Sequence, residues 1–527
     1  MSCPLSIFDI PHIVEGIGAC LGRNDLVSCT LINKASSEYF RRLLWRELVF
    51  KPLSVVDPMT EPAHSKTLLN NLQWTRSLTI DTSNRGDILP LVSRTCTRLQ
   101  HLKTLVALSM NDCNSTDVPP ILSLVANNPN LLSWSMYSEV APPINFMMKM
   151  PLVIAKSPLT ELELEFRLCP RRGWLRYALQ NLPQSLKTLI LRWKNFRRSS
   201  EPMVLVDQAW PQCYPHMETA DFSIELGVGE ELAICHFLER CPGLKSLTYP
   251  PMASTHIINP IAELGAKLSN LTTLYLGWLN KITDSQWKGL VMAMKGRIKH
   301  FSTDAGFNTP STKFVPDITT HWADTLESLR FLHFSHMYSR DVQRILTSCS
   351  KLKVLDCMWT LEEEAVQGTS SGVEMEDWVC QDLEELHLMF ADNRKVNLEE
   401  PEMSLQEISA ARRIERIYQQ LGHLVKLKEL TIGWRTSNVF SECANLDMSL
   451  ASGLGYLGDL KALRALDVSS IRKVKIRNDE VEWMLQHWPL LKELYGLRSR
   501  FSSRNRREPV PDYIASLCSV RPDLIIQ

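Results

Sequence analysis

The stretch Leu271–Asp284, "LTTLYLGWLNKITD", places leucines at positions 271, 274 and 276. An amphipathic helix would space its apolar residues three and four apart, and a half-buried strand would alternate throughout. This stretch fits neither pattern alone, although Leu274 and Leu276 have the alternation of a short strand. The spacing is therefore informative only if it recurs.

The spacing recurs along most of the chain. Weaker copies begin at Thr75, Leu105, Leu131, Met217, Ile298, Leu329 and Leu491. Clear copies are LTELEL from Leu159, LKTLIL from Leu186, LKSLTY from Leu244, LKVLDC from Leu352, LEELHL from Leu383, LKELTI from Leu427 and LRALDV from Leu463. Between Leu105 and Ile298 successive copies start 26 to 31 residues apart. A self-similar period of this length indicates a solenoid of stacked repeats.

Each copy is expected to supply a short strand, and the rest of each period to return through a helix. Returning helices are recognisable from Ile121, Ala233 and Val342, and the first two end at Pro129 and Pro242. The pattern resembles the cysteine-containing class of leucine-rich repeat, whose own Ile-Thr-Asp triplet is similar to residues 282–284. The resemblance implies an α/β leucine-rich-repeat solenoid of about 14–15 repeats over residues 71–527. It would be a horseshoe with a concave parallel sheet and convex helices.

The bulk composition excludes several classes of protein. The 58 basic and 58 acidic residues balance, so charge does not indicate a nucleic-acid or membrane partner. The 14 cysteines are too few for a disulfide scaffold and include no Cys-x-x-Cys pair, so we expect no metal and no cofactor. No apolar run reaches transmembrane length, and the N-terminus lacks a secretory pattern. These features predict an intracellular location, cytoplasmic and/or nuclear.

Residues 1–50 lack the repeat and are followed by a predicted linker over residues 51–70, which carries prolines and little periodicity. Pro11 is typical of a helix N-terminus. We expect the first helix to end at Gly22 and Asp25 to cap the second. Three short helices in about 45 residues would make a very small core, which a partner surface could complete.

The N-terminal segment resembles an F-box, the module through which substrate receptors dock on the Skp-type adaptor of SCF-type cullin-RING ubiquitin ligases. Ile10-Pro11 is similar to the family's Leu-Pro opening, Asp25-Leu26 to its Asp-Leu step and Leu44-Trp45 to its Leu-Trp close. The acidic residue that usually follows Leu-Pro is absent, and Ser36 stands where tryptophan is frequent. The resemblance implies adaptor binding by Ile10, Pro11, Ile13, Val14, Ile17, Leu21, Leu26, Ile32 and Trp45. A helical cap on the repeat array is the alternative, because terminal repeats need capping.

An aromatic residue lies two positions after the last apolar strand position in six copies. Aromatic residues make up 8% of the chain, so six in about fourteen copies exceed the roughly one expected. Stacking would set these rings in a row, which is either a substrate-binding stripe or a structural ladder of packed rings. The six are Phe166, Trp193, Trp278, Trp359, Phe390 and Trp434.

Arginines are concentrated in the segment 496–509, which includes Arg498 and Arg500. One hypothesis is that these two residues bind an acidic or phosphorylated segment of a substrate through charge-assisted hydrogen bonds. The other is a solvated loop with incidental positive charge.

The chain contains no nucleophile elbow, phosphate loop or His-Glu-x-x-His motif, so we expect no enzyme activity. The sequence predicts the substrate-recognition subunit of an SCF-type ubiquitin ligase. Its F-box would dock on the Skp-type adaptor and cullin-RING ligase, and its repeats would bind a protein substrate of unknown identity. The alternative is a non-ligase leucine-rich-repeat scaffold or inhibitor that binds a protein partner. Neither hypothesis includes nucleic acid or a membrane.

Overall fold

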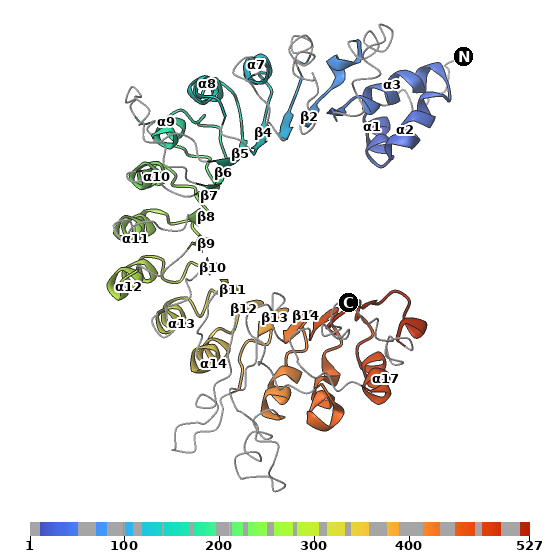
Figure 1. Cartoon of the computed structure of the whole chain (residues 1–527), viewed down its shortest axis with the longest axis vertical. Helices are drawn as coiled ribbons and strands as arrows, with labels where there is room; N and C mark the ends of the chain where they lie inside the picture. Colours follow the sequence, from blue (N-terminus) through green and yellow to red (C-terminus); the bar gives the residue numbers. More distant parts are fainter. Residues whose placement is uncertain are drawn as a thin grey trace, which may run out of the picture. The chain divides into compact units, whose positions relative to one another are not determined.

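Short parallel strands alternate with helices along the chain in the computed structural model (Figure 1). The structure describes residues 11–50, 70–81, 99, 101–108, 118–139, 142–168, 173–195, 210, 213–224, 230–249, 258–277, 282–304, 314–332, 339–357, 377–388, 415–432, 448–468, 477–496 and 517–526. These residues belong to two units. Unit 1 comprises residues 1–253 and 267–270, and unit 2 comprises residues 254–266 and 271–527.

Unit 1 begins with three helices and continues as a sheet. Its helices are α1 (Pro11–Ala19), α2 (Arg23–Thr30), α3 (Lys34–Leu44), the 3₁₀ turn η2 (Leu72–Trp74), α7 (Val118–Asn127), α8 (Ile144–Ile154), α9 (Trp174–Gln180) and α10 (Glu230–Leu238). Its strands are β1 (Glu47–Phe50), β2 (Ser77–Asp81), β3 (Thr104–Leu108), β4 (Ser133–Ser138), β5 (Glu161–Leu168), β6 (Thr188–Asn195), β7 (Thr219–Ile224) and β8 (Ser246–Tyr249).

Unit 2 repeats the same alternation. Its helices are α11 (Ile258–Lys267, all but its last residue), α12 (Asp284–Ala293), α13 (Val315–His321), α14 (Ser339–Ser348), the 3₁₀ helices η5 (Leu450–Ser452) and η6 (Leu454–Asp459), and α17 (Asn478–His487). Its strands are β9 (Thr273–Leu276), β10 (His300–Asp304), β11 (Ser328–Leu332), β12 (Val354–Cys357), β13 (Glu385–Leu388), β14 (Glu429–Ile432), β15 (Ala465–Asp467), β16 (Glu493–Tyr495) and β17 (Ile525–Ile526).

Within each unit the strands pair in chain order, all parallel. The fourth residue of each copy faces its counterpart in the next strand. Leu105, for example, is in register with Leu78 on β2 and with Trp134 on β4. All three side chains are fully buried, because alternate strand residues point toward the helices. In unit 1, helices α7 to α10 lie on this face of the sheet, and in unit 2 helices α12 to α14 do the same (Figure 1). The predicted α/β leucine-rich-repeat solenoid is confirmed.

Within each unit, one carbonyl of a copy joins it to the following copy. The carbonyl of Arg76, the second residue of its copy, accepts hydrogen bonds from the N–H groups of Lys103 (2.7 Å) and Thr104 (3.0 Å). The same two-bond pattern joins Arg46 to Arg76 and Ser77. We call the second residues of the copies the position-2 row. Their side chains follow one another along the edge where the strands begin, with about 4.8 Å between adjacent strands.

Each of the fifteen predicted copies falls on a strand, but two were placed three residues out of register. Leu105 pairs with Leu78, so that copy begins at Leu102 rather than at Leu105. Leu329 pairs with Phe301, so the second copy begins at Leu326. Leucines recur every third residue in both stretches, so the spacing alone did not distinguish the two registers.

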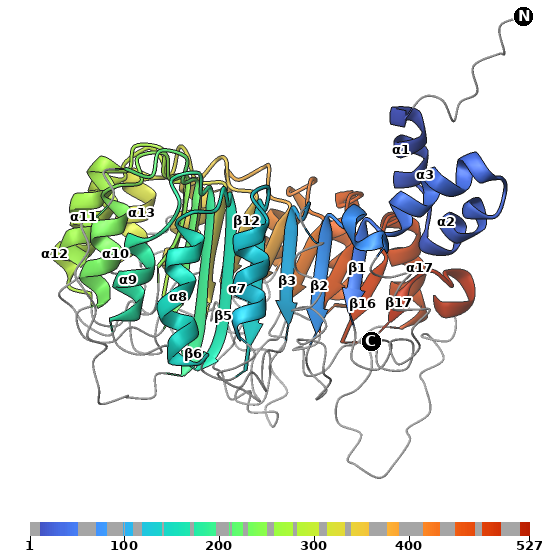
Figure 2. The same cartoon turned by 90° about the horizontal axis from the view of Figure 1, so that it is seen from above.

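The sheet also begins earlier than expected. Strand β1 lies inside the range predicted to be wholly helical, and Leu48 pairs with Leu78. Trp45 therefore occupies the first position of an additional copy, "WRELVF", in which tryptophan replaces the usual leucine. Helices α1 to α3 lie at the β1 end of this sheet (Figure 2).

Candidate functional site

The N-terminal helices are defined by local caps. Gly22 precedes α2, and its N–H donates to the Asp25 carboxylate at 3.2 Å, so Asp25 caps from the third helical position. Asn33 precedes α3 and accepts a 2.8 Å hydrogen bond from the Ser36 N–H, while its own N–H donates to the Ser36 hydroxyl at 3.1 Å. Such reciprocal caps satisfy backbone donors at a helix start. The predicted helix start at Pro11 is confirmed, whereas α1 ends at Ala19, before Gly22.

The core of this three-helix module is small. Val14 and Phe40 are 1% and 3% exposed, and Gly18 is buried where α1 approaches α3. A Cβ at Gly18 would overlap the Leu43 Cδ1 atom at the tip of that side chain, so the two helices approach closely at this point. Helix α2 contributes no buried residue at all.

Apolar side chains on the module are exposed instead. Leu31 and Ile32, between α2 and α3, are 81% and 65% exposed, and Val27 on α2 is 43% exposed. Ile13 and Ile17 on α1 are 39% and 40% exposed. We call these five residues the apolar surface of the module. All five lie within 20 residues of chain, and apolar side chains exposed in this way offer area that a partner could cover.

The predicted adaptor-binding residues differ in their exposure to solvent. Ile13, Ile17 and Ile32 belong to the apolar surface, whereas Val14 lies in the core and has no surface to offer a partner. Leu21, Leu26 and Trp45 are half-buried, while Ile10 and the Pro11 side chain lie outside the described residues. The F-box resemblance does not include Val27 and Leu31, which are exposed as well. Both are apolar residues adjacent to the matched Leu26 and Ile32, and that adjacency was the available signal.

The second candidate region is the face of the sheet opposite the helices. Most of its strand residues in unit 1 are polar, among them Arg192 on β6. The Arg192 guanidinium donates to Glu163 on β5 at 3.2 Å and to Asp221 on β7 at 3.0 Å. Asp221 also accepts from the Ser223 hydroxyl at 2.7 Å. Because Glu165 lies 3.9 Å from the same guanidinium, one cation faces three carboxylates.

The corresponding face of unit 2 is also polar. Arg330 on β11 forms a 3.0 Å ion pair with Glu385 on β13, which spans the intervening strand β12. The Tyr275 hydroxyl donates to Asp304 on the next strand. A polar, hydrogen-bonded sheet face of this kind suits the recognition of a protein surface better than the burial of an apolar ligand.

The predicted aromatic row is testable at two positions. Phe166 and Trp193 are 1% and 2% exposed and are in register on β5 and β6. Each packs edge-on against Trp174 of α9, with ring centroids 6.2 and 6.1 Å apart. At these positions the rings form a packed ladder and offer no exposed surface to a substrate. Trp278, Trp359, Phe390, Trp434, Arg498 and Arg500 lie outside the described residues.

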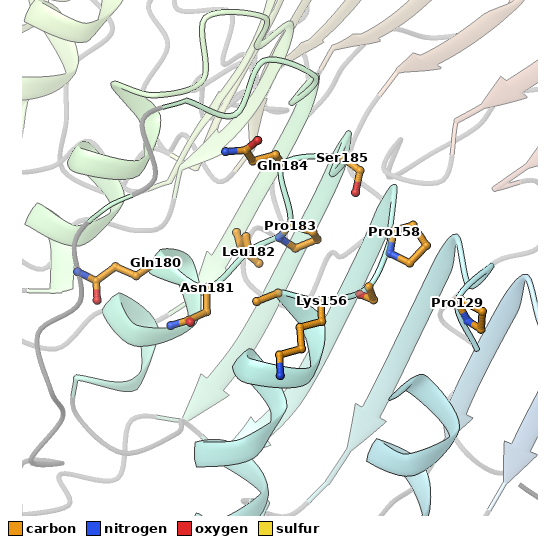
Figure 3. Close-up of a pocket in the computed structure, with 11 residues that line it drawn as sticks. Pro129, Lys156, Pro158, Gln180, Asn181, Leu182, Pro183, Gln184 and Ser185 are labelled. Atoms are coloured by element: carbon orange, nitrogen blue, oxygen red, sulfur yellow. The ribbon is translucent and has the colours of Figure 1, made fainter. Parts of the chain in front are cut away.

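A hollow of about 660 Å³ lies at the edge of unit 1 where strands β4 to β6 begin (Figure 3). Pro129, Pro158 and Pro183 line it from three successive turns. Two of its polar side chains form hydrogen bonds with the backbone. The Asn181 Nδ2 group donates to the Tyr177 carbonyl at 2.8 Å, and the Ser185 hydroxyl donates to the Leu159 carbonyl at 2.8 Å. The hollow therefore has the character of a surface depression between repeats.

The buried cysteines are unreactive packing residues, as expected for Cys241, Cys349 and Cys357, all of which are free. Burial raises the pKa of the Cys349 thiol to about 12 and that of the Cys235 thiol to about 11. A thiol with so high a pKa remains protonated at neutral pH and is a poor nucleophile.

The described part of the chain holds no group of three or more His, Cys, Asp and Glu side chains arranged for a metal ion. Within that part, no helix combines the length and the apolar character needed to cross a membrane.

Comparison with known proteins supports no closer classification. No protein-family model and no curated protein sequence matches the chain. Among solved structures it is similar to the TLR13–ssRNA13 complex, at 15% identity and a TM-score of 0.35 over 80% of this chain and 46% of that chain. The Rad7 and Elc1 complex in yeast matches at 11% identity and a TM-score of 0.35 over 100% and 98% of the two chains.

A third similar structure is the leucine-rich-repeat-containing protein LegL7 from Legionella pneumophila, at 11% identity and a TM-score of 0.30 over 79% of this chain and 97% of that chain. The chain thus spans about half the length of the TLR13 chain and nearly all of the other two. The assignment of the fold rests on this chain's own strand register and helix placement.

Proposed function

We propose that this chain is a protein-recognition subunit of an SCF-type ubiquitin ligase. Helices α1 to α3 dock on a Skp-type adaptor, and the open face of the repeats holds a protein substrate. The chain contributes binding and positioning, while the ubiquitin-transfer chemistry belongs to other subunits. Its effect would be to raise the local concentration of substrate lysines near the activated ubiquitin.

The observation that carries the proposal is the apolar surface of the module. Ile17, Leu31 and Ile32 are 40%, 81% and 65% exposed in a three-helix module that buries few side chains. Removing apolar surface from water contributes about 25 cal/mol per Å², so a partner that covers this surface gains binding energy and completes the module's core.

The substrate part of the proposal is supported by the open sheet faces. The Arg192 guanidinium and the carboxylates around it are only partly exposed, and the Asp221 side chain is 15% exposed. The guanidinium is hydrogen-bonded to Glu163 and Asp221. Partly buried, hydrogen-bonded charges fix orientation and specificity more than they add affinity. Such a face selects a partner by the position of its charged groups.

A second function, a scaffold outside any ligase, is favoured by one observation. Strand β1 follows α3 directly and pairs with β2, so the helical module is continuous with the repeats. A helical cap on the array would have the same connection.

The test measures binding of a purified Skp-type adaptor to the full-length chain by calorimetry. The variant Ile13→Asp/Ile17→Asp places charges on the apolar surface. The matched control, Ile144→Asp/Leu152→Asp, places them on α8, where these side chains are 41% and 44% exposed. Far-ultraviolet circular dichroism verifies that both variants fold.

We expect the α1 variant to lose adaptor binding and the α8 variant to retain it. Affinity purification of the same proteins from cells, with the proteasome and neddylation inhibited, should show loss of adaptor and cullin from the α1 variant alone. If the wild-type chain does not bind the adaptor, or both variants bind it equally, the ligase proposal is wrong and the scaffold function remains.

A further inference from the structure

The position-2 row alternates in charge along much of unit 2. Glu327 forms ion pairs with Lys299 on one side, at 3.0 Å, and with Lys353 on the other, at 2.8 Å. Glu384, the next residue of the row, pairs with Lys428. Each of these lysines therefore has a glutamate on an adjacent strand, and opposite charges alternate from Lys299 to Lys428.

The same alternation occurs in unit 1 between β6 and β8. Glu218 pairs with Lys245 at 3.0 Å, and the strand register places Lys187 opposite Glu218 on the other side. Opposite charges on neighbouring strands are stabilising, whereas like charges side by side are destabilising. Alternation is thus the arrangement that the fold favours.

Three consecutive residues of the row break this alternation. Arg46, Arg76 and Lys103 occupy position 2 of the first three copies, and all are exposed. Backbone hydrogen bonds link each residue to the next. The Arg76 N–H donates to the Arg46 carbonyl at 2.9 Å, and the Lys103 N–H donates to the Arg76 carbonyl at 2.7 Å. The three α-carbons are therefore only about 4.8 Å apart from strand to strand.

None of these three cations has an ion pair with a carboxylate among the residues that the structure describes. The nearest acidic residue in sequence, Glu47, occupies position 3 beside Arg46, and no described contact joins the two side chains. We call Arg46, Arg76 and Lys103 the cationic row. It keeps three like charges together without internal compensation.

A second run of cations, Lys428, Arg464 and Lys492, is different. Lys428 is already paired with Glu384, and Lys492 is close enough to Asp523 to help lower the pKa of that carboxyl group. The bidentate contact of Arg521 with the same carboxylate is the larger influence. Both ends of this run thus interact with a carboxylate, whereas no ion pair joins the cationic row to a carboxylate among the described residues.

We propose that the cationic row is a docking site for an acidic peptide segment of a protein partner. An extended segment laid across the three strands would place carboxylates next to these cations. The partner would thus supply the ion pairs that Glu327 and Glu384 supply to lysines within unit 2. The row spans about 10 Å over three strands, a length that a few residues of extended chain cover. Nucleic-acid binding usually neutralises roughly 6 to 10 phosphates, far more than three cations provide.

This proposal does not require the ligase function. Arg46 directly follows Trp45 at the end of α3, so the cationic row begins where the helical module ends. A partner could contact both surfaces, or the row alone. The two proposals are tested with different probes.

The experiment uses the full chain and a short fluorescein-labelled peptide of alternating glutamate and serine, with fluorescence anisotropy at low and at physiological ionic strength. The test variant is Arg76→Gln/Lys103→Gln. The control, Lys299→Gln/Lys353→Gln, removes the same charge from the same repeat positions, where both lysines are paired with Glu327.

We expect the test variant to weaken peptide binding by roughly two- to thirtyfold, from two exposed ion pairs of about 0.2–1 kcal/mol each, and the control to bind as tightly as the wild-type chain. Binding by the wild-type chain should weaken as salt rises. Equal weakening in both variants, or no binding by the wild-type chain, would overturn the proposal. A single-stranded oligonucleotide of matched charge that binds more tightly through the same residues would overturn the peptide assignment.

Discussion

Helices α2 and α9 show how differently the two parts of unit 1 use their apolar residues. None of the eight residues of α2 is buried, whereas six of the seven residues of α9 are, among them Trp174 and Leu179. A repeat helix lies between the helices before and after it and against the sheet below. The N-terminal helices lack those neighbours, so apolar side chains such as Ile17 and Val27 remain in solvent. Exposed apolar surface thus arises where stacking stops.

The position-2 row shows the electrostatic form of the same contrast. Between β10 and β14 a charged residue of the row has an opposite charge on the next strand, as Glu327 has with Lys353. At the first three strands Arg46, Arg76 and Lys103 have like charges instead. Apolar and charged groups are therefore both left uncompensated near the N-terminal end of unit 1.

The largest expected loss of stability comes from a substitution in the packed repeats of unit 1. Trp174 is 0% exposed, its rings contact Phe166 and Trp193, and its Nε1–H donates to the Met147 carbonyl at 2.9 Å. Trp174→Ala should destabilise unit 1 by about 3–5 kcal/mol, because the cavity spans two repeats. Urea unfolding gives the magnitude, and hydrogen exchange should locate the loosening in β5 and β6. A loss below about 1 kcal/mol would contradict the packed-ladder description.

The next effect compares two glycines. A Cβ at Gly422 would overlap the backbone carbonyl oxygen of Tyr456, which cannot turn away, whereas a Cβ at Gly18 would meet only the tip of the Leu43 side chain. Gly422→Ala should cost about 1–3 kcal/mol as an overpacked contact. Gly18→Ala should cost less, since Leu43 can change rotamer and alanine favours the helix. Thermal unfolding of both variants tests the order, and the reverse order would show that the module is packed as tightly as the repeats.

A smaller effect depends on pH. Hydrogen bonds from Lys353 and Lys299 lower the pKa of Glu327 from 4.5 to about 2. Because the folded-state pKa lies below the unfolded one, this stabilisation is complete above the unfolded pKa and is lost as the pH falls toward 2. Glu327→Gln should therefore cost about 0.5–1 kcal/mol at neutral pH.

The difference in the free energy of unfolding between the wild-type protein and Glu327→Gln should decrease steadily as the pH falls. Urea unfolding of both proteins over a series of acidic pH values measures it. A difference that stays constant with pH would show that the ion pairs do not act through the charge of Glu327.

The smallest expected change in stability comes from a substitution at an exposed apolar residue of the N-terminal helices. Ile17→Ser on α1 should change the free energy of unfolding by no more than about 0.5 kcal/mol, because the side chain is 40% exposed and the substitution leaves the core intact. Urea unfolding checks this value. A loss above about 2 kcal/mol would mean that Ile17 is a structural residue and that the apolar surface is part of a larger core.

The sequence by itself determined the repeat and the class of fold. Leu271, Leu274 and Leu276 show the spacing, and their recurrence at a nearly constant period predicts parallel strands with returning helices, because only stacking buries such short apolar segments. Local signals also placed the start of α1 at Pro11 and the helix ends before the strands.

Tertiary structure decided what stacking brings together. The register of the copies at Leu102 and Leu326 depends on pairing with neighbouring strands, since leucines three residues apart satisfy either choice. Phe166 and Trp193 are buried because Trp174 reaches them from a helix of the same repeat layer, a contact that residue spacing does not encode.

The two candidate surfaces depend on tertiary structure for the same physical reason. Arg46, Arg76 and Lys103 are separated by 27 to 30 residues of sequence, and only the stacking of parallel strands sets their charges side by side. Val14 and Ile17 both fit one helical pattern, but packing against α3 buries the first and leaves the second in solvent. Spacing along the chain identifies which residues share an element, and packing between elements decides which of them remain available to a partner.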